Sequence, residues 1–328
     1  MLKNVTLIFS AAFLIMLSGC GNGQNDAASD TISISSLQIG DHLALDDARR
    51  GFVSGMADEG WIEGQNLNFT HFSAQGDISI GHVMAQQIVE NEPDLILGIA
   101  TSTSQALANA TETIPIVITA VTDPLRADLV ESLERPGRNV TGTSDLSPVY
   151  DQFNLLVNLL PDVQTVGIIY NAGEINSQIL AALAVENARR LGLNYVEVTV
   201  ATTADVAQAT ESIVERVDVI YTPTCNTVAA AIPVVAAIAD EHGVPIIGGN
   251  ANHVFGGALA TQGVDYYRLG RQAAAMAAQI LRGEAVPAEM PIQWQDEFNL
   301  VINQTAADRL GFTIPEGFLS TAQLFEED

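Results

Sequence analysis

The sequence predicts an α/β protein made of two similar lobes, each a parallel sheet flanked by helices. Strand-like and helix-like segments alternate along the chain, the strands are almost wholly apolar, and the alternation restarts near the middle. Strands that are apolar at nearly every position are buried on both faces, as in a parallel sheet covered by crossover helices. At 328 residues the chain is also long enough for two domains of ordinary size.

The N-terminal lobe is predicted over residues 31–144. Its strand-like runs are 31–39, 66–72, 94–100 and 114–121, and the helical runs between them are 44–60, 78–92 and 102–113. Each helical run links two strands, which is the pattern of repeated strand–helix–strand units.

The C-terminal lobe is predicted over residues 145–262. Its strand-like runs are 165–170, 194–200, 218–222 and 244–249, and its helical runs are 177–192, 205–217 and 226–242. Pro233 lies inside the last of these helical runs, where its missing amide N–H predicts a kink.

The remaining C-terminal segments are too few for a third lobe. A long helix over 266–283 is followed by one short strand-like and one short helical segment. We therefore expect residues from about 263 to 290 to complete the first lobe, and residues from about 291 to 328 to complete the second.

The N-terminus predicts export. Residues 1–19 combine a short basic start, an apolar run too short to span a membrane comfortably and small residues, as a secretory signal peptide does. They end at "LSGC", which resembles a bacterial lipoprotein signal, so Cys20 becomes the lipidated first residue and 20–30 a flexible tether. The alternative is an unprocessed membrane anchor. We expect a protein held by lipid alone at the cell membrane or outer membrane, facing the periplasm or the exterior.

The charge of the chain excludes several partners. The formal net charge is −26, from 39 acidic and 13 basic residues. Nucleic acid is excluded because phosphate binding needs a basic patch, and an anionic membrane surface would repel the chain. The five histidines show no compact metal-ligand spacing, and GxGxxG, P-loop and GxSxG motifs are absent, so we expect no metal, no cofactor and no enzyme.

Ligands of open parallel sheets bind at the carboxyl ends of the strands. Thr101, Ser102, Thr103 and Ser104 follow such a strand and begin a helix. Hydroxyls and free N–H groups at a helix N-terminus can hold a carboxylate, which makes this a candidate anion cradle. The structural alternative is ordinary helix capping, which needs only one such residue.

Other strand ends also carry polar residues. The candidate ligand-binding residues among them are Thr122, Asp145, Asn171, Asn176, Asn226 and Asn250. Asp145 either orients a turn or receives a ligand cation, whereas Asp123 is interpreted as mainly structural.

Cys225 follows one strand and precedes an Ala-rich helix. A thiol there is a nucleophile only beside a positioned base, and no histidine is marked out as one. The other two interpretations are an inert apolar residue and a residue that lines the ligand pocket.

The segment "VTDPLRADLVESLERPGRNVTGTSDLSP" (121–148) resembles the signature of a family of ABC-transporter substrate-binding lipoproteins that includes tryptophan- and tyrosine-binding members. Further similar segments are "HLALDDARRGF", "EGWIEGQN", "TPTCNTV", "GALATQGVDYYRLGRQAA" and "LVINQTAADRLGFTIPE". They span nearly the whole mature chain.

The resemblance implies the type I periplasmic-binding fold, with a hinge of three crossovers and a ligand between the lobes. It implies an extracytoplasmic receptor, expected to be a monomer, that binds a small carboxylate-bearing solute such as an aromatic amino acid or a related compound. The receptor delivers this solute to a permease and its ATPase on separate chains. An alternative is a sensory lipoprotein that signals to a membrane kinase or chemoreceptor, and an exported enzyme is a third option.

Two positions depart from the family. Relatives usually carry an acid where this chain has Cys225, and often one where it has Asn250. Neutral residues lack the charge that pairs with a ligand ammonium, although Asp145 could supply it. This interpretation predicts that Cys225→Asp strengthens the binding of a ligand with an amino group.

Overall fold

The structure is a computed structural model that describes residues 31–327. The predicted signal peptide (1–19), the predicted lipidation site Cys20 and the predicted tether (20–30) lie outside the described residues. The strands of the described part form two sheets, each with helices on both faces. The predicted α/β class with two lobes is therefore confirmed.

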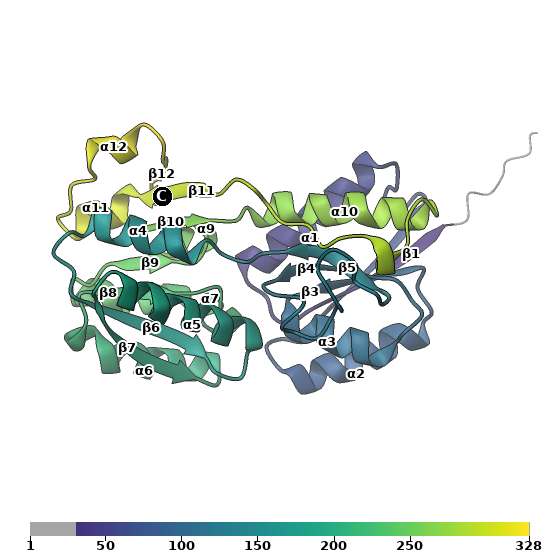
Figure 1. Ribbon diagram of the computed structural model, residues 1–328, viewed down its shortest axis with the longest axis horizontal. Helices are drawn as coiled ribbons and strands as arrows, with labels where there is room; N and C mark the ends of the chain where they lie inside the picture. Colours follow the sequence, from purple (N-terminus) through teal and green to yellow (C-terminus); the bar gives the residue numbers. More distant parts are fainter. Residues whose placement is uncertain (1–30, 328) are drawn as a thin grey trace, which may run out of the picture. The chain divides into compact units, whose positions relative to one another are not determined.

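The N-terminal lobe contains a five-stranded parallel sheet in the order β2-β1-β3-β4-β5 (Figure 1). Its strands are β1 (Ile32–Gln38), β2 (Leu67–Ser73), β3 (Leu95–Ile99), β4 (Ile116–Val121) and β5 (Val140–Ser144). Its helices are α1 (Leu43–Asp58), α2 (Ile78–Glu90), α3 (Thr101–Ala110) and α10 (Tyr266–Leu281). Every residue of β3, β4 and β5 is buried, as expected for strands covered on both faces.

Helices α1 and α10 pack side by side on one face of this sheet, and α2 and α3 cover the other face (Figure 1). The close approach of α1 and α10 depends on Gly270, because a Cβ there would collide with the carbonyl oxygen of Ala48. The long predicted helix near the C-terminus thus belongs to the N-terminal lobe.

The C-terminal lobe contains a seven-stranded sheet in the order β12-β11-β10-β9-β8-β6-β7. The strands are β6 (Thr165–Asn171), β7 (Asn194–Val200), β8 (Val219–Thr222), β9 (Ile246–Gly248), β10 (Ala260–Gly263), β11 (Asn299–Asn303) and β12 (Gln323–Phe325). The α-helices are α4 (Val149–Leu159), α5 (Ile175–Arg190), α6 (Val206–Ile213), α7 (Asn226–Ala229), α8 (Ile232–Glu241), α9 (Ala251–Phe255), α11 (Gln304–Arg309) and α12 (Glu316–Leu319). Strand β11 is antiparallel to β10, whereas the other pairs in this sheet are parallel.

The chain passes between the two sheets three times. The first passage lies between β5 and α4, the second between β10 and α10, and the third before β11. Gln293 N donates to Gly142 O at 2.9 Å, and Ile292 N donates to Leu133 O at 2.8 Å, so both residues still contact the N-terminal lobe. The third passage therefore begins slightly later than the position near 290 expected from the sequence.

Several elements differ from the sequence prediction. Strand β5 was not predicted, because the small and polar residues of "VTGTS" lack the apolar run of a buried strand. Helices α4, α9 and α12 and strands β10 and β12 were not predicted either. The single helix expected around Pro233 is divided into α7 and α8. Pro233 lies in the first turn of α8, where no N–H is needed, so it begins a helix instead of bending one.

Candidate ligand-binding site

An enclosed slot lies at the carboxyl ends of strands from both sheets. It is lined by His42, Ala44, Leu45, Ala120, Asp145, Asn176, Thr224, Cys225, Asn226, Ala229, Asn250 and Tyr266. Only about 10 Å³ of the slot is open to the centre of a water molecule, so its own side chains nearly fill it. The slot is therefore narrow in at least one dimension.

Asp145 is the buried carboxylate of the slot, with 3% of its surface exposed. It directly follows β5, and its Oδ1 accepts a hydrogen bond from Thr122 Oγ1 at 3.0 Å. Its Oδ2 accepts a hydrogen bond from Tyr266 Oη, at the start of α10, at 2.5 Å. Since a carboxylate has about four lone-pair sites and both of these partners are neutral hydroxyls, Asp145 keeps acceptor capacity and an uncompensated charge.

Burial is the main influence on the pKa of Asp145. Removal from water raises this pKa above its usual value, and the hydrogen bonds from Tyr266 and Thr122 oppose the rise only in part. The pKa of Tyr266 is also raised, by burial and by the nearby Asp145. A cation placed in the slot would favour the ionised form of Asp145 and so would be bound by it.

The first turn of α1 lies beside the same slot. Ala44 and Leu45 line it, and the side chain of His42, at the N-cap position, makes no capping hydrogen bond. The N-terminus of a helix carries partial positive charge and free N–H donors, so it attracts an anion. Thr224 also lines the slot, and its buried Oγ1 makes no hydrogen bond of normal geometry within residues 31–327, although the Thr224 side chain lies near enough to Tyr266 to lower the pKa of that hydroxyl slightly.

The backbone is strained beside the slot. Ala120 has φ 55° and Ala100 has φ 80°, although neither is glycine. The register between β4 and β5 also shifts between Ile118 and Val121. Left-handed φ values in residues with a Cβ cost about 1–2 kcal/mol and tend to occur where a functional site needs the backbone in a particular place.

The wall of the slot formed by the C-terminal lobe is organised around Glu174. Its Oε2 accepts from Asn226 N at 3.0 Å and from Asn226 Nδ2 at 2.8 Å. Its Oε1 accepts from Thr227 N at 3.0 Å and from Thr227 Oγ1 at 2.6 Å. Longer contacts come from Ser177 Oγ and Asn176 Nδ2. Glu174 is thus occupied by its own lobe.

Cys225 is fully buried and lines the slot. Its Sγ lies 3.7 Å from Glu174 Oε1, and it accepts a hydrogen bond from Asn171 N at 3.3 Å. Burial, and to a lesser degree the charge of Glu174, raises the pKa of Cys225 to about 12. The thiol therefore stays neutral near pH 7, which favours the pocket-lining interpretation over a nucleophile.

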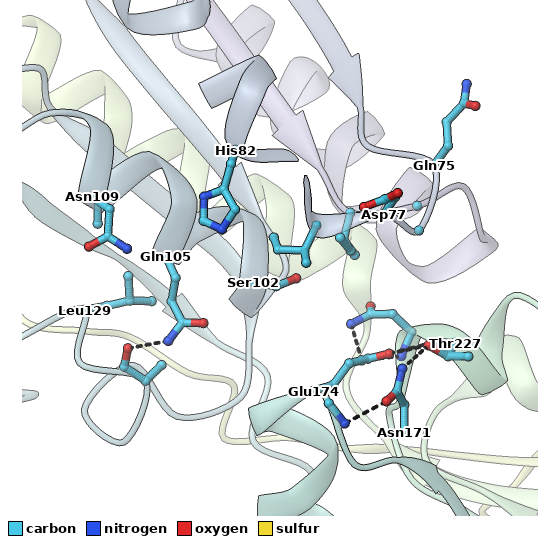
Figure 2. Close-up of a pocket in the computed structure, with 18 of the residues that line it drawn as sticks. Gln75, Asp77, His82, Ser102, Gln105, Asn109, Leu129, Asn171, Glu174 and Thr227 are labelled. Carbon is cyan, nitrogen blue, oxygen red and sulfur yellow. Dashed lines mark hydrogen bonds between the residues drawn. The ribbon is translucent and has the colours of Figure 1, made fainter. Parts of the chain in front are cut away.

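Outside the slot lies a wider cleft of about 2180 Å³. In Figure 2, Ser102 and Gln105 of α3 lie on one side of this cleft, and Asn171, Glu174 and Thr227 lie on the other. Asn226 lines both the cleft and the slot, so the two spaces are neighbours.

Half of the ten ligand-binding residues predicted from the sequence line the slot. They are Asp145, Asn176, Cys225, Asn226 and Asn250. Two of them also serve the local fold, because Asn250 Oδ1 caps α9 through Asn252 N and Asn176 Nδ2 donates to Thr224 O.

The other five predicted residues lie elsewhere. Thr122 is buried behind the slot and bonds to Asp145, whereas Ser102 and Asn171 line the outer cleft. Thr101 and Thr103 are buried in the first turn of α3. The Thr103 hydroxyl donates to Ile99 O at 2.6 Å, but Thr101 Oγ1 has no partner among the described residues.

Sequence reasoning missed several residues of the site, among them Glu174, His42 and Tyr266. Glu174 was visible in "YNAGEIN" as an acid directly after a strand, which was a usable signal. His42 carried a similar signal, because it follows the first strand, whereas Tyr266 carried none, because it reaches the slot only through the return of α10 to the first lobe. His42 Nε2 lies 3.2 Å from Asn226 Oδ1, so these two side chains join the two lobes directly.

Residues 31–327 contain no group of three or more His, Cys, Asp or Glu side chains arranged to hold a metal ion. None of the helices in that range has the length and apolar character required to cross a bilayer.

Two sheet lobes with an enclosed polar slot at their strand ends define a solute-binding protein of the periplasmic type. A family model described as ABC transporter substrate binding protein matches residues 33–325. The chain belongs to this family, whose members bind solutes for transport.

Individual relatives agree with this assignment. The chain is 37% identical over 314 residues to a tyrosine-binding protein of Clostridioides difficile, covering 92% of this chain and 90% of the relative. A Streptococcus pneumonia ABC domain solved in complex with L-Trp is 35% identical, with a TM-score of 0.86, covering 90% of this chain and 99% of that one.

A ligand-free, open structure of a Clostridium difficile substrate-binding protein with adhesive properties is 36% identical, covering 90% of this chain and 100% of that one. Its TM-score is only 0.69. Since the two solved relatives are equally distant in sequence, the described chain is closer in conformation to the L-Trp complex than to the open form.

Proposed function

We propose that this substrate-binding protein binds an aromatic L-amino acid in the slot, with the ligand ammonium on Asp145. The buried, incompletely compensated carboxylate of Asp145 is the observation that carries this proposal. A charge-assisted hydrogen bond to an ammonium would use the free acceptor capacity of Asp145 and supply the missing positive charge.

The ligand carboxylate fits the first turn of α1. Ala44 and Leu45 present this turn to the slot, and no side chain caps it. The unpartnered Thr224 hydroxyl gives a further donor. The first turn of α3, with Thr101, Ser102 and Thr103, is the alternative position suggested by the sequence.

An aromatic amino acid can enter the slot only when the slot widens, because about 10 Å³ of it is open to the centre of a water molecule. The names of the relatives, one a tyrosine-binding protein and one solved with L-Trp, support the same ligand class.

The cellular setting follows from the family and from the N-terminal sequence. We propose an exported receptor anchored through lipidated Cys20, which works as a monomer and passes its ligand to a permease with a separate ATPase. In this proposal residues 31–144 and 145–262 form the two lobes, and each lobe is completed by part of the C-terminal tail.

Calorimetry on the soluble chain tests the ligand. L-Tyr, L-Trp and L-Phe are titrated beside their deaminated carboxylic acids and their amides. We expect the amino acids to bind and both derivative series to bind at least tenfold more weakly, because each lacks one of the two charges. Equal binding of the deaminated acids would refute the role of Asp145.

A further inference from the structure

One continuous chain of hydrogen bonds crosses the slot. It begins at Glu174 after β6, continues through Asn226 at the start of α7, and ends at His42 at the start of α1. Glu174 and Asn226 belong to the C-terminal lobe and His42 to the N-terminal lobe. The chain therefore joins the lobes beside the ligand site.

The orientation of the Asn226 amide follows from Glu174. An ionised carboxylate only accepts hydrogen bonds, so the Asn226 atom 2.8 Å from Glu174 Oε2 must be the Nδ2 donor. Asn226 N, at 3.0 Å from the same oxygen, holds the backbone beside it. The Oδ1 of Asn226 is then the atom turned towards the opposite lobe.

The orientation of Asn226 in turn decides the state of His42. Asn226 Oδ1 lies 3.2 Å from His42 Nε2, and an amide oxygen accepts but does not donate. His42 must therefore carry a proton on Nε2. In the neutral ring this leaves Nδ1 unprotonated, so a single tautomer is selected by a carboxylate in the other lobe.

We infer that Glu174 is a positioning residue for ligand binding, because it orients Asn226 so that His42 must donate a hydrogen bond from one lobe to the other. The inference rests on the proposed function in one respect: its effect on affinity is measured with an aromatic amino acid. In a closed receptor a direct bond between the lobes stabilises the arrangement that encloses the ligand, and affinity falls when that arrangement is less populated.

The charged and titratable groups around His42 are consistent with a neutral ring. Burial lowers its pKa, whereas Asn226, Glu174, Asp46 and Asp41 oppose this change. His253, in helix α9 of the C-terminal lobe, is buried as well. Its pKa is lowered to about 3, mainly by burial and to a smaller extent by the charge of His42.

The first experiment reads the tautomer directly, in the ligand-free protein and again with saturating L-Trp, because the bond between the lobes belongs to the closed arrangement. Nitrogen-15 NMR of the imidazole rings, with His42→Gln to assign the signals, should show His42 protonated on Nε2. In Glu174→Gln the residue at 174 is both donor and acceptor, so the Asn226 amide is free to turn and the single tautomer should be lost. Protonation on Nδ1 in the wild type, or unchanged ring signals in Glu174→Gln, would overturn the inference.

The second experiment measures affinity for L-Tyr and L-Trp by calorimetry. One hydrogen bond is worth a factor of about three to ten, so we expect Asn226→Ala, Glu174→Gln and His42→Ala to bind that much more weakly. His42→Gln restores an N–H donor and should recover part of the loss seen in His42→Ala. Glu197→Gln, which removes the same charge on exposed β7, is the matched control and should bind as the wild type does.

Thermal unfolding accompanies each titration, so that a misfolded variant is recognised. Wild-type affinity in a folded Asn226→Ala, or no recovery in His42→Gln, would contradict the inference. If no aromatic amino acid binds to the wild type, the proposed function fails, whereas the ring signals of the ligand-free protein still decide the role of Glu174.

Discussion

The two carboxylates beside the slot differ in how many hydrogen bonds they accept. Asp145 of the N-terminal lobe accepts one hydrogen bond on each oxygen, both from neutral hydroxyls. Glu174 of the C-terminal lobe accepts four bonds of 3.0 Å or less from two consecutive residues, Asn226 and Thr227. Asp145 can therefore accept further hydrogen bonds, whereas the oxygens of Glu174 are already fully used.

This difference separates binding from positioning. A buried acid with few donors keeps a raised pKa and gains most from a cation that arrives later. A saturated acid gains little from a ligand, but it orders the groups that donate to it. The missing acid at position 225 is thus not replaced by Glu174, although Glu174 lies beside it, because Glu174 already serves its own lobe.

Removing the charge of Asp145 should have the largest effect. Asp145→Asn keeps the size of the side chain but leaves the ligand ammonium without an ionised partner. Losing one partner of a buried charge pair costs about 3 kcal/mol, so we expect affinity for L-Tyr or L-Trp to fall by about a hundredfold in calorimetry.

The matched control is Asp128→Asn, an exposed acid of the same lobe that lines only the outer cleft. It should bind the ligand as the wild type does. Comparable affinity of Asp145→Asn and Asp128→Asn would remove Asp145 from the site.

Placing a second acid beside Glu174 is the next test. In Cys225→Asp a carboxylate replaces a buried thiol whose sulfur lies 3.7 Å from Glu174 Oε1. Repulsion and desolvation should lower the free energy of unfolding by about 2 kcal/mol at pH 7, measured by urea unfolding. Cys225→Ser, which adds no charge, is the control.

The stability of Cys225→Asp should depend on pH in a definite direction. The repulsion raises a carboxyl pKa in the folded state, so folding takes up a proton at pH values between the ordinary and the raised pKa. The loss of stability should therefore shrink as the pH falls through that window. An added amino acid should also stabilise Cys225→Asp more than the wild type, since its ammonium relieves the repulsion; a smaller stabilisation would contradict the prediction made from the sequence.

The lobes were predictable from the sequence because buried parallel strands leave a strong local signal. Strand β3 is apolar and buried along its whole length, and its prediction is confirmed. Strand β5 is equally buried but contains Thr, Gly and Ser, and its burial comes from neighbouring elements far along the chain. Nothing within its own residues distinguishes it from a loop.

The ligand-binding site was predictable only in part, because some of its contacts join residues far apart in the sequence. Asp145 and Cys225 lie at strand ends, and the position of strand ends follows from the strand pattern. Tyr266 meets Asp145 because α10 returns to the first lobe after the second passage, a contact between residues 121 positions apart. Local patterns carry no information about such contacts.

The affinity of the wild type should depend on pH through Asp145. Its pKa is raised by burial in the free protein, and the ligand ammonium needs the ionised form. Affinity should therefore be constant above this pKa and fall by up to about tenfold per pH unit below it. Calorimetry with L-Trp across a pH series should show the fall beginning above the usual range for aspartate. Asp145→Asn should bind weakly with no such dependence, and an equally steep fall in this variant would assign the titration to another group.

The smallest expected effect belongs to the hydroxyl that supports Asp145. Tyr266→Phe removes the 2.5 Å hydrogen bond to Oδ2 and leaves the ring in place. One donor fewer makes the ionised carboxylate less stable, so the pKa of Asp145 should rise further and affinity should fall by about two- to tenfold at pH values below that pKa. The neighbouring Tyr267→Phe changes the same chemical group on the same helix without touching Asp145, and should leave affinity unchanged. Because Tyr266→Phe acts through the carboxylate, its binding curve should be displaced to higher pH and rejoin the wild-type curve in alkaline solution. A loss of affinity that is uniform across pH would mean instead that the hydroxyl contacts the ligand itself.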